Sequence, residues 1–266
     1  MNSQTRQRLE GGRRSRGAER TQPPLISIIT VVFRARQELE AILENVFQFD
    51  ARDFEMIVID GGSNDGTAEL LRQWDDRVDY WVSEPDKGIF DAMNKAQTFA
   101  RGQFLLHINA GDRVLHIPTE ELRDALRQGL DIVTFPVSVD GNRVFRPSCG
   151  FMLRLKNTLH HQGTFYRREN FLSYDLALPK LADFDVNQRL ALKGARMKAY
   201  NTIVASHVSG GAGDSIVGYD EHIRIMRKNY GSLYLYISIA LSEFKGIKGR
   251  RKAAFKRWLS RMRGSR

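Results

Sequence analysis

The stretch FEMIVIDGGSNDGT, at residues 54–67, joins an apolar run to a polar loop that is rich in glycine. The apolar run predicts a strand buried on both faces of a sheet, because apolar and polar residues do not alternate along it. Asp60 ends this strand, and the tight loop after it opens a helix that continues through Leu71. We therefore expect a strand, a loop and a helix in direct succession, which is how a βαβ unit begins.

The same order of elements extends from this stretch in both directions. Upstream, the β-branched apolar run at residues 26–33 predicts another buried strand, and apolar residues at 39–47 recur at helical spacing. Downstream, strands are predicted at 78–82 and 103–108, with a helix at 89–100 between them. This alternation predicts an α/β fold in which helices flank a mostly parallel central sheet.

Beyond Asp112 the pattern is looser. Residues 130–135 predict one more strand, and residues 137–139 and 143–145 flank an Asp-Gly-Asn sequence that is typical of a hairpin turn. Apolar residues such as Val186 recur at helical spacing further along the chain.

Composition excludes several classes of protein. The chain has 266 residues, of which 27% are charged, and this fits a folded globular protein rather than a disordered one. Its one cysteine, Cys149, excludes an internal disulfide framework and a Cys-rich zinc site. No apolar run reaches the roughly 18 residues that a membrane-spanning helix needs. The basic start is not followed by the apolar segment of a secretory signal.

The formal net charge of +10 is concentrated at the two ends of the chain. Residues 1–24 carry a net charge of +4 and residues 245–266 carry +10, so the residues between them carry −4. Because the middle is mildly acidic, we expect no specific nucleic-acid partner. Residues 1–24 have little apolar surface to bury, and they are predicted to form a disordered basic tail.

Residues 232–266 predict an apolar segment followed by a basic amphipathic helix. Four apolar residues of this helix fall on one face, with basic residues on the rest: Phe255, Trp258, Leu259 and Met262. Such a helix suits the surface of an anionic membrane, so residues 245–266 are expected to bind one. A solvated basic tail that binds nucleic acid without specificity is the alternative.

Three polar clusters follow predicted strands, at residues 60–62, 84–88 and 109–112. Ligands of α/β sheets bind outside the carboxyl ends of the strands, which is where these clusters fall. Lys87 could neutralise a phosphate, and Asp112 could ligate a divalent metal ion, which prefers oxygen ligands. For each cluster, turn formation and helix capping are the alternative interpretation.

Four motifs carry a resemblance to a known family: SIITVVFR at 27–34, FEMIVIDGGSNDGT at 54–67, VSEPDKGIFDAMNKA at 82–96 and NAGD at 109–112. They resemble the family 2 glycosyltransferases, which have the GT-A fold. They are most similar to the branch that builds bacterial exopolysaccharides such as colanic acid. The resemblance covers residues 26–216 and implies one Rossmann-like GT-A domain over residues 25–231.

The resemblance also implies roles for individual residues. Asp183 would be the general base, and Asp112 would bind Mg²⁺ or Mn²⁺ on the donor diphosphate. The residues implied to bind the nucleotide sugar are Val31, Phe33, Asp60, Asp86, Lys87 and Asn109. Those implied to face the acceptor, or to support groups that do, are His161, Gln162 and Asp185.

Two positions depart from the family pattern. Phe33 stands where many relatives carry Tyr, so a hydroxyl contact is lost while ring stacking remains. Asn109 and Gly111 replace acids of fuller metal motifs, which leaves Asp112 as the only carboxylate there. The remaining histidines show no spacing typical of ligands and are expected to be structural: His107, His116, His160, His207 and His222.

The function implied is that of an inverting glycosyltransferase. It would move a sugar from a UDP- or GDP-sugar to a lipid-linked saccharide, at the cytoplasmic face of the cell membrane. A nucleotide-sugar-binding protein and a nucleotidyltransferase of similar fold are the alternatives. The latter would need a glycine-rich loop directly after the first strand, and residues 33–37 contain no glycine.

Overall fold

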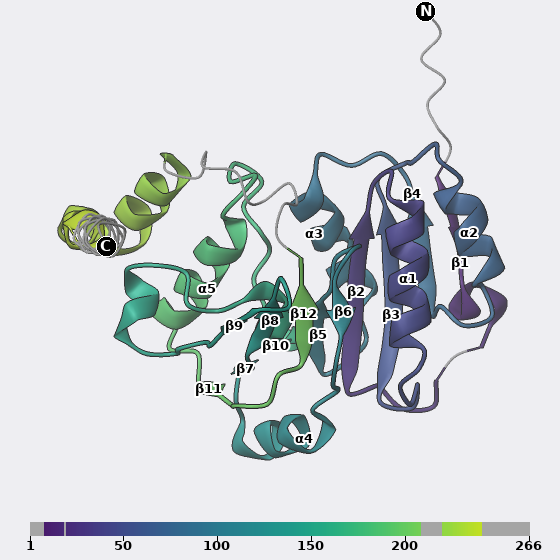
Figure 1. The fold of residues 1–266 in the computed structure, drawn as a ribbon, viewed down its shortest axis with the longest axis horizontal. Helices are drawn as coiled ribbons and strands as arrows, with labels where there is room; N and C mark the ends of the chain where they lie inside the picture. The colour runs from purple at the N-terminus through teal and green to yellow at the C-terminus, as the bar shows by residue number, and fades with distance from the viewer. Residues whose placement is uncertain (1–7, 19, 209–219, 241–266) are drawn as a thin grey trace, which may run out of the picture.

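The computed structural model describes residues 8–18, 20–208 and 220–240 of the protein, which form two sheets flanked by helices (Figure 1). In spatial order, the eight strands of the large sheet are β1 (Leu9–Gly11), β4 (Tyr80–Ser83), β3 (Phe54–Asp60), β2 (Ile26–Val32), β5 (Phe104–His107), β10 (Thr164–Arg167), β7 (Ile132–Thr134) and β11 (Met197–Ala199). The four strands of the small sheet are β6 (Arg113–Val114), β12 (Ala205–His207), β8 (Val137–Val139) and β9 (Arg143–Phe145).

Helices connect most of these strands. The α-helices are α1 (Arg36–Val46), α2 (Thr67–Gln73), α3 (Ile89–Phe99), α4 (Thr119–Gln128) and α5 (Ala182–Leu192). Residues 220–240 are helical as well. Short 3-10 helices are η1 (Arg13–Arg16), η2 (Phe151–Arg154), η3 (His161–Gly163) and η4 (Arg168–Asn170).

The centre of the large sheet is a block of parallel strands in the order β4-β3-β2-β5. β2 and β3 pair along their whole length, and all seven residues of each strand are buried. The carboxyl ends of the four strands lie side by side at one end of the block, which we call the carboxyl edge. Their amino ends lie side by side at the opposite end, which we call the amino edge. β1 and β10 add to this block in the antiparallel sense, so the sheet as a whole is mixed.

Each face of the parallel block has its own core. Alternate residues of β2 point to opposite faces, since Ile28 belongs to one core and Ile29 to the other. Helices α1, α2 and α4 contribute to the core that contains Ile28, and α3 and α5 to the core that contains Ile29. Burial on both sides explains why the strand sequences are apolar without alternation.

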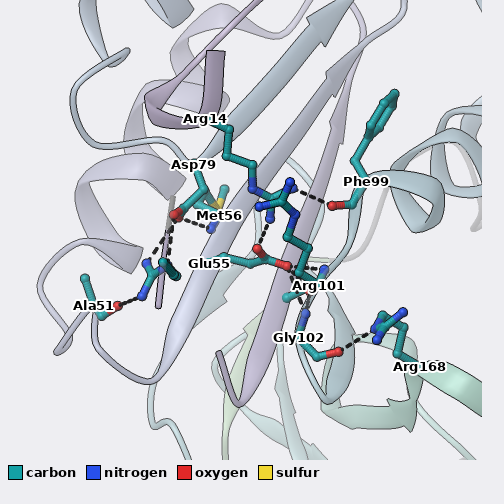
Figure 2. Close-up of polar contacts among 11 residues, drawn as sticks. Arg14, Ala51, Glu55, Met56, Asp79, Phe99, Arg101, Gly102 and Arg168 are labelled. Atoms are coloured by element: carbon teal, nitrogen blue, oxygen red, sulfur yellow. Dashed lines mark hydrogen bonds and ion pairs between the residues drawn. The ribbon is translucent and has the colours of Figure 1, made fainter. Parts of the chain in front are cut away.

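Residues 8–18 and 20–24, which we call the N-terminal strap, contradict the expectation of a disordered tail. Within the strap, β1 pairs antiparallel with β4 and is an edge strand of the large sheet. Arg14 forms an ion pair with the buried carboxylate of Glu55 (Figure 2), and Arg20 Nε donates to Oδ1 of Asp79 over 3.1 Å.

The strap docks although it has few apolar residues. It is held by backbone pairing with β4 and by arginines that bond to buried carboxylates, and neither kind of contact needs apolar side chains. The remainder of the expected tail, residues 1–7 and 19, lies outside the described residues.

The small sheet contains the predicted hairpin. β8 and β9 pair antiparallel with Val139 opposite Arg143, so the loop between them has the three residues 140–142. Its first two residues, Asp140 and Gly141, have φ values of 53° and 69°, the left-handed conformation that Asp and Gly adopt readily in tight turns. β12 pairs with β8 on one side and with β6 on the other, which brings His207 next to the loop that follows β5.

The helical residues 220–240 pack on α5 by one face only. Ile225, Met226 and Leu235 are buried in the core that α5 shares, while Leu233 and Tyr236 are 68% and 65% exposed. Gly231 has a φ of 81°, so two helical stretches meet there. Among the described residues, no helix is long and apolar enough to cross a membrane. The basic residues 245–266 lie outside that part of the chain.

Candidate active site

Two residues implied to bind the nucleotide, Phe33 and Asp86, lie on either side of Gly61 at the carboxyl edge of the parallel block. A Cβ added to Gly61 would lie 2.6 Å from Asp86 Oδ2 and 3.2 Å from Phe33 Cδ2, so only glycine fits between these side chains. The Phe33 ring is 55% exposed, which leaves it open to stack on a planar ligand. Burial raises the pKa of the Asp86 carboxyl, which accepts a hydrogen bond from Gly88 N over 2.8 Å.

Asp60 and Val31 are turned inward at the same edge. The fully buried Asp60 carboxylate accepts hydrogen bonds from Ser63 N at 3.1 Å and from Ser83 Oγ at 2.6 Å. It therefore holds the loop between β3 and α2, and its direct contact with a base stays a prediction. Val31 is buried in the core next to α3, which leaves its backbone to contact a ligand.

Lys87 precedes the amino terminus of α3. Its side chain is exposed, and its backbone N–H donates to Asp91 Oδ2 over 2.9 Å. A lysine at the start of a helix adds its charge to the positive end of the helix dipole, so this corner of the carboxyl edge favours an anion.

Asp112, after β5, is held at the centre of a small polar group. Its Oδ1 lies 2.7 Å from His207 Nδ1, and its Oδ2 accepts from Gln162 Nε2 at 2.7 Å and from Asn109 N at 3.0 Å. Asn109 Oδ1 is buried and has no hydrogen-bond partner among the described residues. The fold thus brings Gln162, which was implied to face the acceptor, to the loop that contains Asn109 and Asp112.

These donors fit a divalent metal ion. Asp112 contacts His207, and Asn109, whose amide oxygen is unsatisfied, bonds to Asp112 through its backbone N–H. A carboxylate, an imidazole and an amide oxygen form a mixed donor set that Mn²⁺ accepts more readily than Mg²⁺. No group of three or more acidic, histidine or cysteine side chains arranged for a metal occurs in the described part of the chain. Substrate oxygens or water would therefore have to complete the coordination.

His207 was expected to be structural, and its contact with Asp112 shows that it belongs to this group. The two residues are 95 positions apart in the sequence. They meet because β12 joins the small sheet beside β6, which directly follows Asp112. No local spacing in the sequence could have revealed this contact.

Asp183 lies in the first turn of α5. Burial raises the pKa of its carboxyl to about 6, against the opposing effects of the helix N–H groups and of Asn157. A carboxyl group with such a pKa takes up and releases protons near neutral pH, which is the requirement for a general base.

A chain of hydrogen bonds holds Asp183 in place. Asn157 Nδ2 donates to Asp183 Oδ2 over 2.8 Å, and Asn187 Nδ2 donates to Asn157 Oδ1 over 3.2 Å. Tyr166 OH in turn donates to Asn187 Oδ1 over 2.8 Å. The carboxylate is thus connected to β10, the strand next to β5 in the large sheet. Sequence reasoning missed Asn157 and Asn187.

Histidine and tyrosine side chains connect Asp183 with Asp112. Burial raises the pKa of Tyr174 well above its usual value, and the nearby Asp183 carboxylate adds to this effect. The Tyr174 ring centre lies 6.4 Å from that of His161, whose pKa is lowered well below its usual value by burial and by neighbouring histidines that include His207. His161 is therefore a neutral side chain that neighbours both Tyr174 and His207.

Several polar atoms of this connecting patch lack partners. Both ring nitrogens of His107 and of His161, and the hydroxyl of Tyr174, are buried without a hydrogen bond among the described residues. The rings of His107 and His161 lie 4.8 Å apart, and burial lowers the pKa of His107 to about 3. Unsatisfied buried polar atoms at this density are typical of a site that is completed by water or by a ligand.

Asp185 faces away from this patch. Its buried carboxylate accepts from Arg189 Nε at 2.6 Å and from Asn229 Nδ2 at 3.1 Å, so it anchors the helical residues 220–240 to α5. These contacts favour the interpretation that Asp185 supports the packing of residues 220–240 on α5, rather than that it faces the acceptor.

Residues 27–178 match the family model described as Glycosyl transferase family 2. Asp112 lies inside this match, and Asp183 and His207 follow it. A PGL/p-HBAD biosynthesis glycosyltransferase of Mycobacterium bovis is 30% identical over 208 residues, which cover 73% of this chain and 81% of the relative. The teichuronic acid biosynthesis glycosyltransferase TuaG of Bacillus subtilis, named as putative, is 32% identical over 93 residues, or 34% of this chain and 37% of TuaG.

Two solved structures show the same fold. S. aureus TarS 1–349 in complex with UDP-GlcNAc matches with a TM-score of 0.59 and 16% identity, over 77% of this chain and 66% of that chain. Mannosyltransferase PcManGT from Pyrobaculum calidifontis, in complex with GDP-Man and Mn²⁺, matches with a TM-score of 0.53 and 18% identity, over 79% and 62%. This chain spans less than two thirds of either solved chain. The expected α/β fold of the GT-A type is confirmed.

Proposed function

Because the chain belongs to glycosyl transferase family 2, and is a glycosyltransferase, we propose that it moves a sugar from a nucleoside diphosphate sugar to a saccharide acceptor with inversion at the anomeric carbon. The printed names of two relatives refer to PGL/p-HBAD and teichuronic acid biosynthesis, which supports a product at the cell surface. We infer a bacterial exopolysaccharide, of which colanic acid is an example, as that product.

One observation carries this proposal: Asp112 with His207, and Asp183, lie at the two ends of one patch of buried His and Tyr side chains. The end with Asp112 and His207 fits a charged leaving group, and the end with Asp183 fits a hydroxyl nucleophile. Inversion by a single displacement needs these two groups on opposite sides of the reacting carbon.

Asp183 accepts the proton of the acceptor hydroxyl as the new glycosidic bond forms. Its pKa of about 6 leaves the carboxylate ionised at neutral pH, yet close enough to neutrality to take a proton readily. Asn157 orients the carboxylate through its hydrogen bond to Oδ2.

At the donor end, the chain supplies positive charge and orientation. A Mg²⁺ or Mn²⁺ ion held by Asp112, with His207 and Asn109 as neighbouring donors, would offset the charge that develops on the leaving diphosphate. Gln162 fixes the orientation of the Asp112 carboxylate through its hydrogen bond to Oδ2. Lys87 and the start of α3 add further positive charge.

The nucleotide base would lie against the exposed ring of Phe33, above Gly61 and beside Asp86. The solved structures of similar fold hold UDP-GlcNAc and GDP-Man, so both uridine and guanosine donors are consistent with this fold. We expect a UDP- or GDP-sugar.

For the acceptor we propose a lipid-linked saccharide, with the enzyme bound peripherally at the cytoplasmic face of the cell membrane. The exposed apolar side chains of Leu233, Tyr236 and Ile237 on the helical residues 220–240 support a membrane-facing surface. Each basic residue of 245–266 close to an anionic surface would contribute about 1 kcal/mol.

The first test of this function is thermal unfolding with UDP, GDP, CDP and dTDP, each with and without Mn²⁺. A ligand at about 100 times its Kd adds about 2.7 kcal/mol of stability, a shift of a few degrees. We expect one nucleotide to give a shift that depends on Mn²⁺, and Asp112→Asn to abolish the Mn²⁺ dependence. Asp124→Asn, on the surface of α4, is the matched control. No shift with any nucleotide would contradict the proposed donor site.

The second test is flotation with vesicles of phosphatidylglycerol. Deletion of residues 245–266 should release the protein, and Leu233→Ser with Tyr236→Ser should weaken binding further. Val144→Ser, at an exposed residue of β9, is the control for a general loss of surface apolarity. Unchanged flotation of the truncated protein would rule out membrane binding through residues 245–266.

A further inference from the structure

The loop that follows β4, residues 84–88, contains Asp86 and Lys87 of the candidate active site, and we call it the donor loop. It packs closely on the loop after β3, since a Cβ added to Gly62 would lie 3.2 Å from Pro85 N. It starts directly from β4, which is also the strand that pairs with the N-terminal strap. The strap therefore contacts the strand from which the donor loop begins.

The strap reaches the start of this loop. β1 pairs with β4 as far as the last residue of β4, with Leu9 opposite Ser83. Ser83 Oγ in turn donates to Asp60 Oδ2 over 2.6 Å. Arg8 comes just before β1, and its Nε lies 3.9 Å from Glu84 Oε2. The strap thus covers the edge of β4 up to the first residue of the donor loop.

Lys95, on α3, holds the donor loop from a second side. Its Nζ lies 2.9 Å from Glu84 Oε1 and donates to the Pro85 carbonyl over 2.9 Å. It also lies 3.7 Å from Asp91 Oδ2, the oxygen that accepts from Lys87 N. One ammonium group is thus in contact with the first two residues of the loop and with the carboxylate that holds its fourth residue.

The charge of Lys95 acts on the loop as well. The side chains of Lys95 and Glu84 are only 26% and 23% exposed, so water screens their attraction less than it would at an open surface. Burial raises the pKa of the Asp86 carboxyl, and the positive charge of Lys95 is among the effects that oppose this rise. Lys95 therefore favours the ionised form of a residue implied to bind the nucleotide.

We propose that the docked strap and Lys95 together hold the donor loop in the conformation that binds the nucleotide, so that docking of the strap and binding of the nucleotide strengthen each other. This inference rests on the proposed donor site. A loop that is held in its binding conformation before the ligand arrives loses less conformational freedom on binding, and the affinity rises accordingly. Glu84 and Lys95 are positioning residues, which act through the donor loop and not on the reacting atoms.

Gly11→Ala tests the contribution of the strap. A Cβ at Gly11 would lie 2.7 Å from two ring atoms of Trp81 and from Asp75 Oδ1, so the substitution displaces β1 from β4 and changes none of the strap arginines. Calorimetry of the full chain with UDP and with GDP, each with Mn²⁺, measures the affinity. The nucleotide that binds the wild type should bind Gly11→Ala about fivefold more weakly. Gly150→Ala is the matched control, because the nearest atom to its Cβ would be 3.8 Å away.

Lys95→Gln tests the second contact. It removes the ion pair with Glu84 and the hydrogen bond to the Pro85 carbonyl, so the same nucleotide should bind about tenfold more weakly. Lys95→Arg keeps the charge and the N–H donors and should bind the nucleotide nearly as well as the wild type does. Lys198→Gln, at an exposed lysine of β11, is the matched control and should bind as the wild type does.

Hydrogen exchange of residues 9–11 supplies a readout that support of the fold alone would not change. Coupling between two sites is reciprocal, so a strap that strengthens nucleotide binding must itself be stabilised by the nucleotide. In the wild type, saturating nucleotide should slow the exchange of these residues about fivefold, and this response should be lost in Lys95→Gln. The measurement on the wild type also serves if Gly11→Ala does not fold.

Equal nucleotide affinity in the wild type, Gly11→Ala and Lys95→Gln would overturn the inference and leave the proposed donor site intact. So would hydrogen exchange of residues 9–11 that does not respond to the nucleotide. Failure of the wild type to bind either nucleotide would contradict the proposed donor site, and the inference with it.

Discussion

The two edges of the parallel block use similar polar residues for opposite purposes. At the amino edge, the buried carboxylate of Glu55 accepts hydrogen bonds from four donors of the protein. At the carboxyl edge, His107, His161 and Asn109 keep buried polar atoms without a partner among the described residues. One edge is complete within the chain, and the other is built so that something else completes it.

This difference separates structural from functional polar groups. A buried polar atom without a hydrogen bond costs about 1–3 kcal/mol, so a chain retains several of them only where they serve a ligand or a reaction. A carboxylate that donors surround stabilises the fold instead. Mutations at the carboxyl edge should therefore change activity, and mutations at the amino edge should change stability.

The largest expected effect is that of Asp183→Asn. The amide cannot accept the acceptor proton, so kcat should fall about 10²- to 10⁴-fold. Stability should not fall, because burial already disfavours the charged carboxyl, as its raised pKa of about 6 shows. Initial rates and urea unfolding measure the two quantities, with Asp124→Asn as the control. Wild-type turnover in Asp183→Asn would remove Asp183 from the mechanism.

Arg14→Ala should have the opposite profile. It leaves the Glu55 carboxylate buried without its counter-charge, and the free energy of unfolding should fall by about 3 kcal/mol. Urea unfolding at pH 7 checks this, and kcat of the remaining folded enzyme should stay unchanged.

Arg16→Ala is the matched control, because Arg16 is exposed and its ion pairs with Asp75 and Asp76 should each contribute less than about 1 kcal/mol. Equal stabilities of the two variants would show that the Arg14–Glu55 pair does not hold the strap.

The strands and helices of the parallel block could be predicted because their signals are local. The run at residues 54–59 is apolar except for Glu55, and the structure shows that alternate residues of such a strand enter two different cores. The turn at Asp140 and Gly141 is equally local, since its residue types alone favour the positive φ values observed.

The docking of the strap and the contact of His207 with Asp112 could not be predicted, because the contacting residues are distant in sequence. Arg14 and Glu55 are 41 positions apart, and Asp112 and His207 are 95 apart. A basic tail and a lone histidine look the same in the sequence whether or not the fold supplies a partner. The role of Asp183 as base stays a prediction from resemblance. Its hydrogen-bond partner Asn157 was not predicted, because nothing in the sequence of a loop asparagine indicates which carboxylate it contacts.

The pH dependence of the wild type should reflect the carboxyl edge. In the proposed mechanism Asp183 accepts a proton only when it is deprotonated, and burial raises its pKa to about 6 in the protein without substrate. The ratio kcat/KM, which reports the pKa of the free enzyme, should therefore be constant above this pH and fall about tenfold per pH unit below it. Rates at substrate concentrations well below KM, measured in steps of about half a pH unit from about pH 4.5 to about pH 8, give the profile. A profile that is flat down to about pH 4.5 would contradict the assignment of Asp183 as the base.

The smallest expected effect is that of Asn157→Ala, which tests whether the hydrogen-bond chain behind Asp183 positions the base. The lost hydrogen bond, 2.8 Å long, favours the charged carboxylate, so its removal should raise the pKa of Asp183 further. The acid limb of kcat/KM should move to higher pH by about one unit.

Two variants control this measurement. Asn170→Ala removes a hydrogen bond of 2.6 Å to the surface residue Asp131 and should leave the profile in place. Asn157→Asp sets a second carboxylate beside Asp183 and should move the limb further than Asn157→Ala, because like charges disfavour ionisation. A loss of rate without any movement of the limb would mean that Asn157 supports the fold around α5 and does not tune the base.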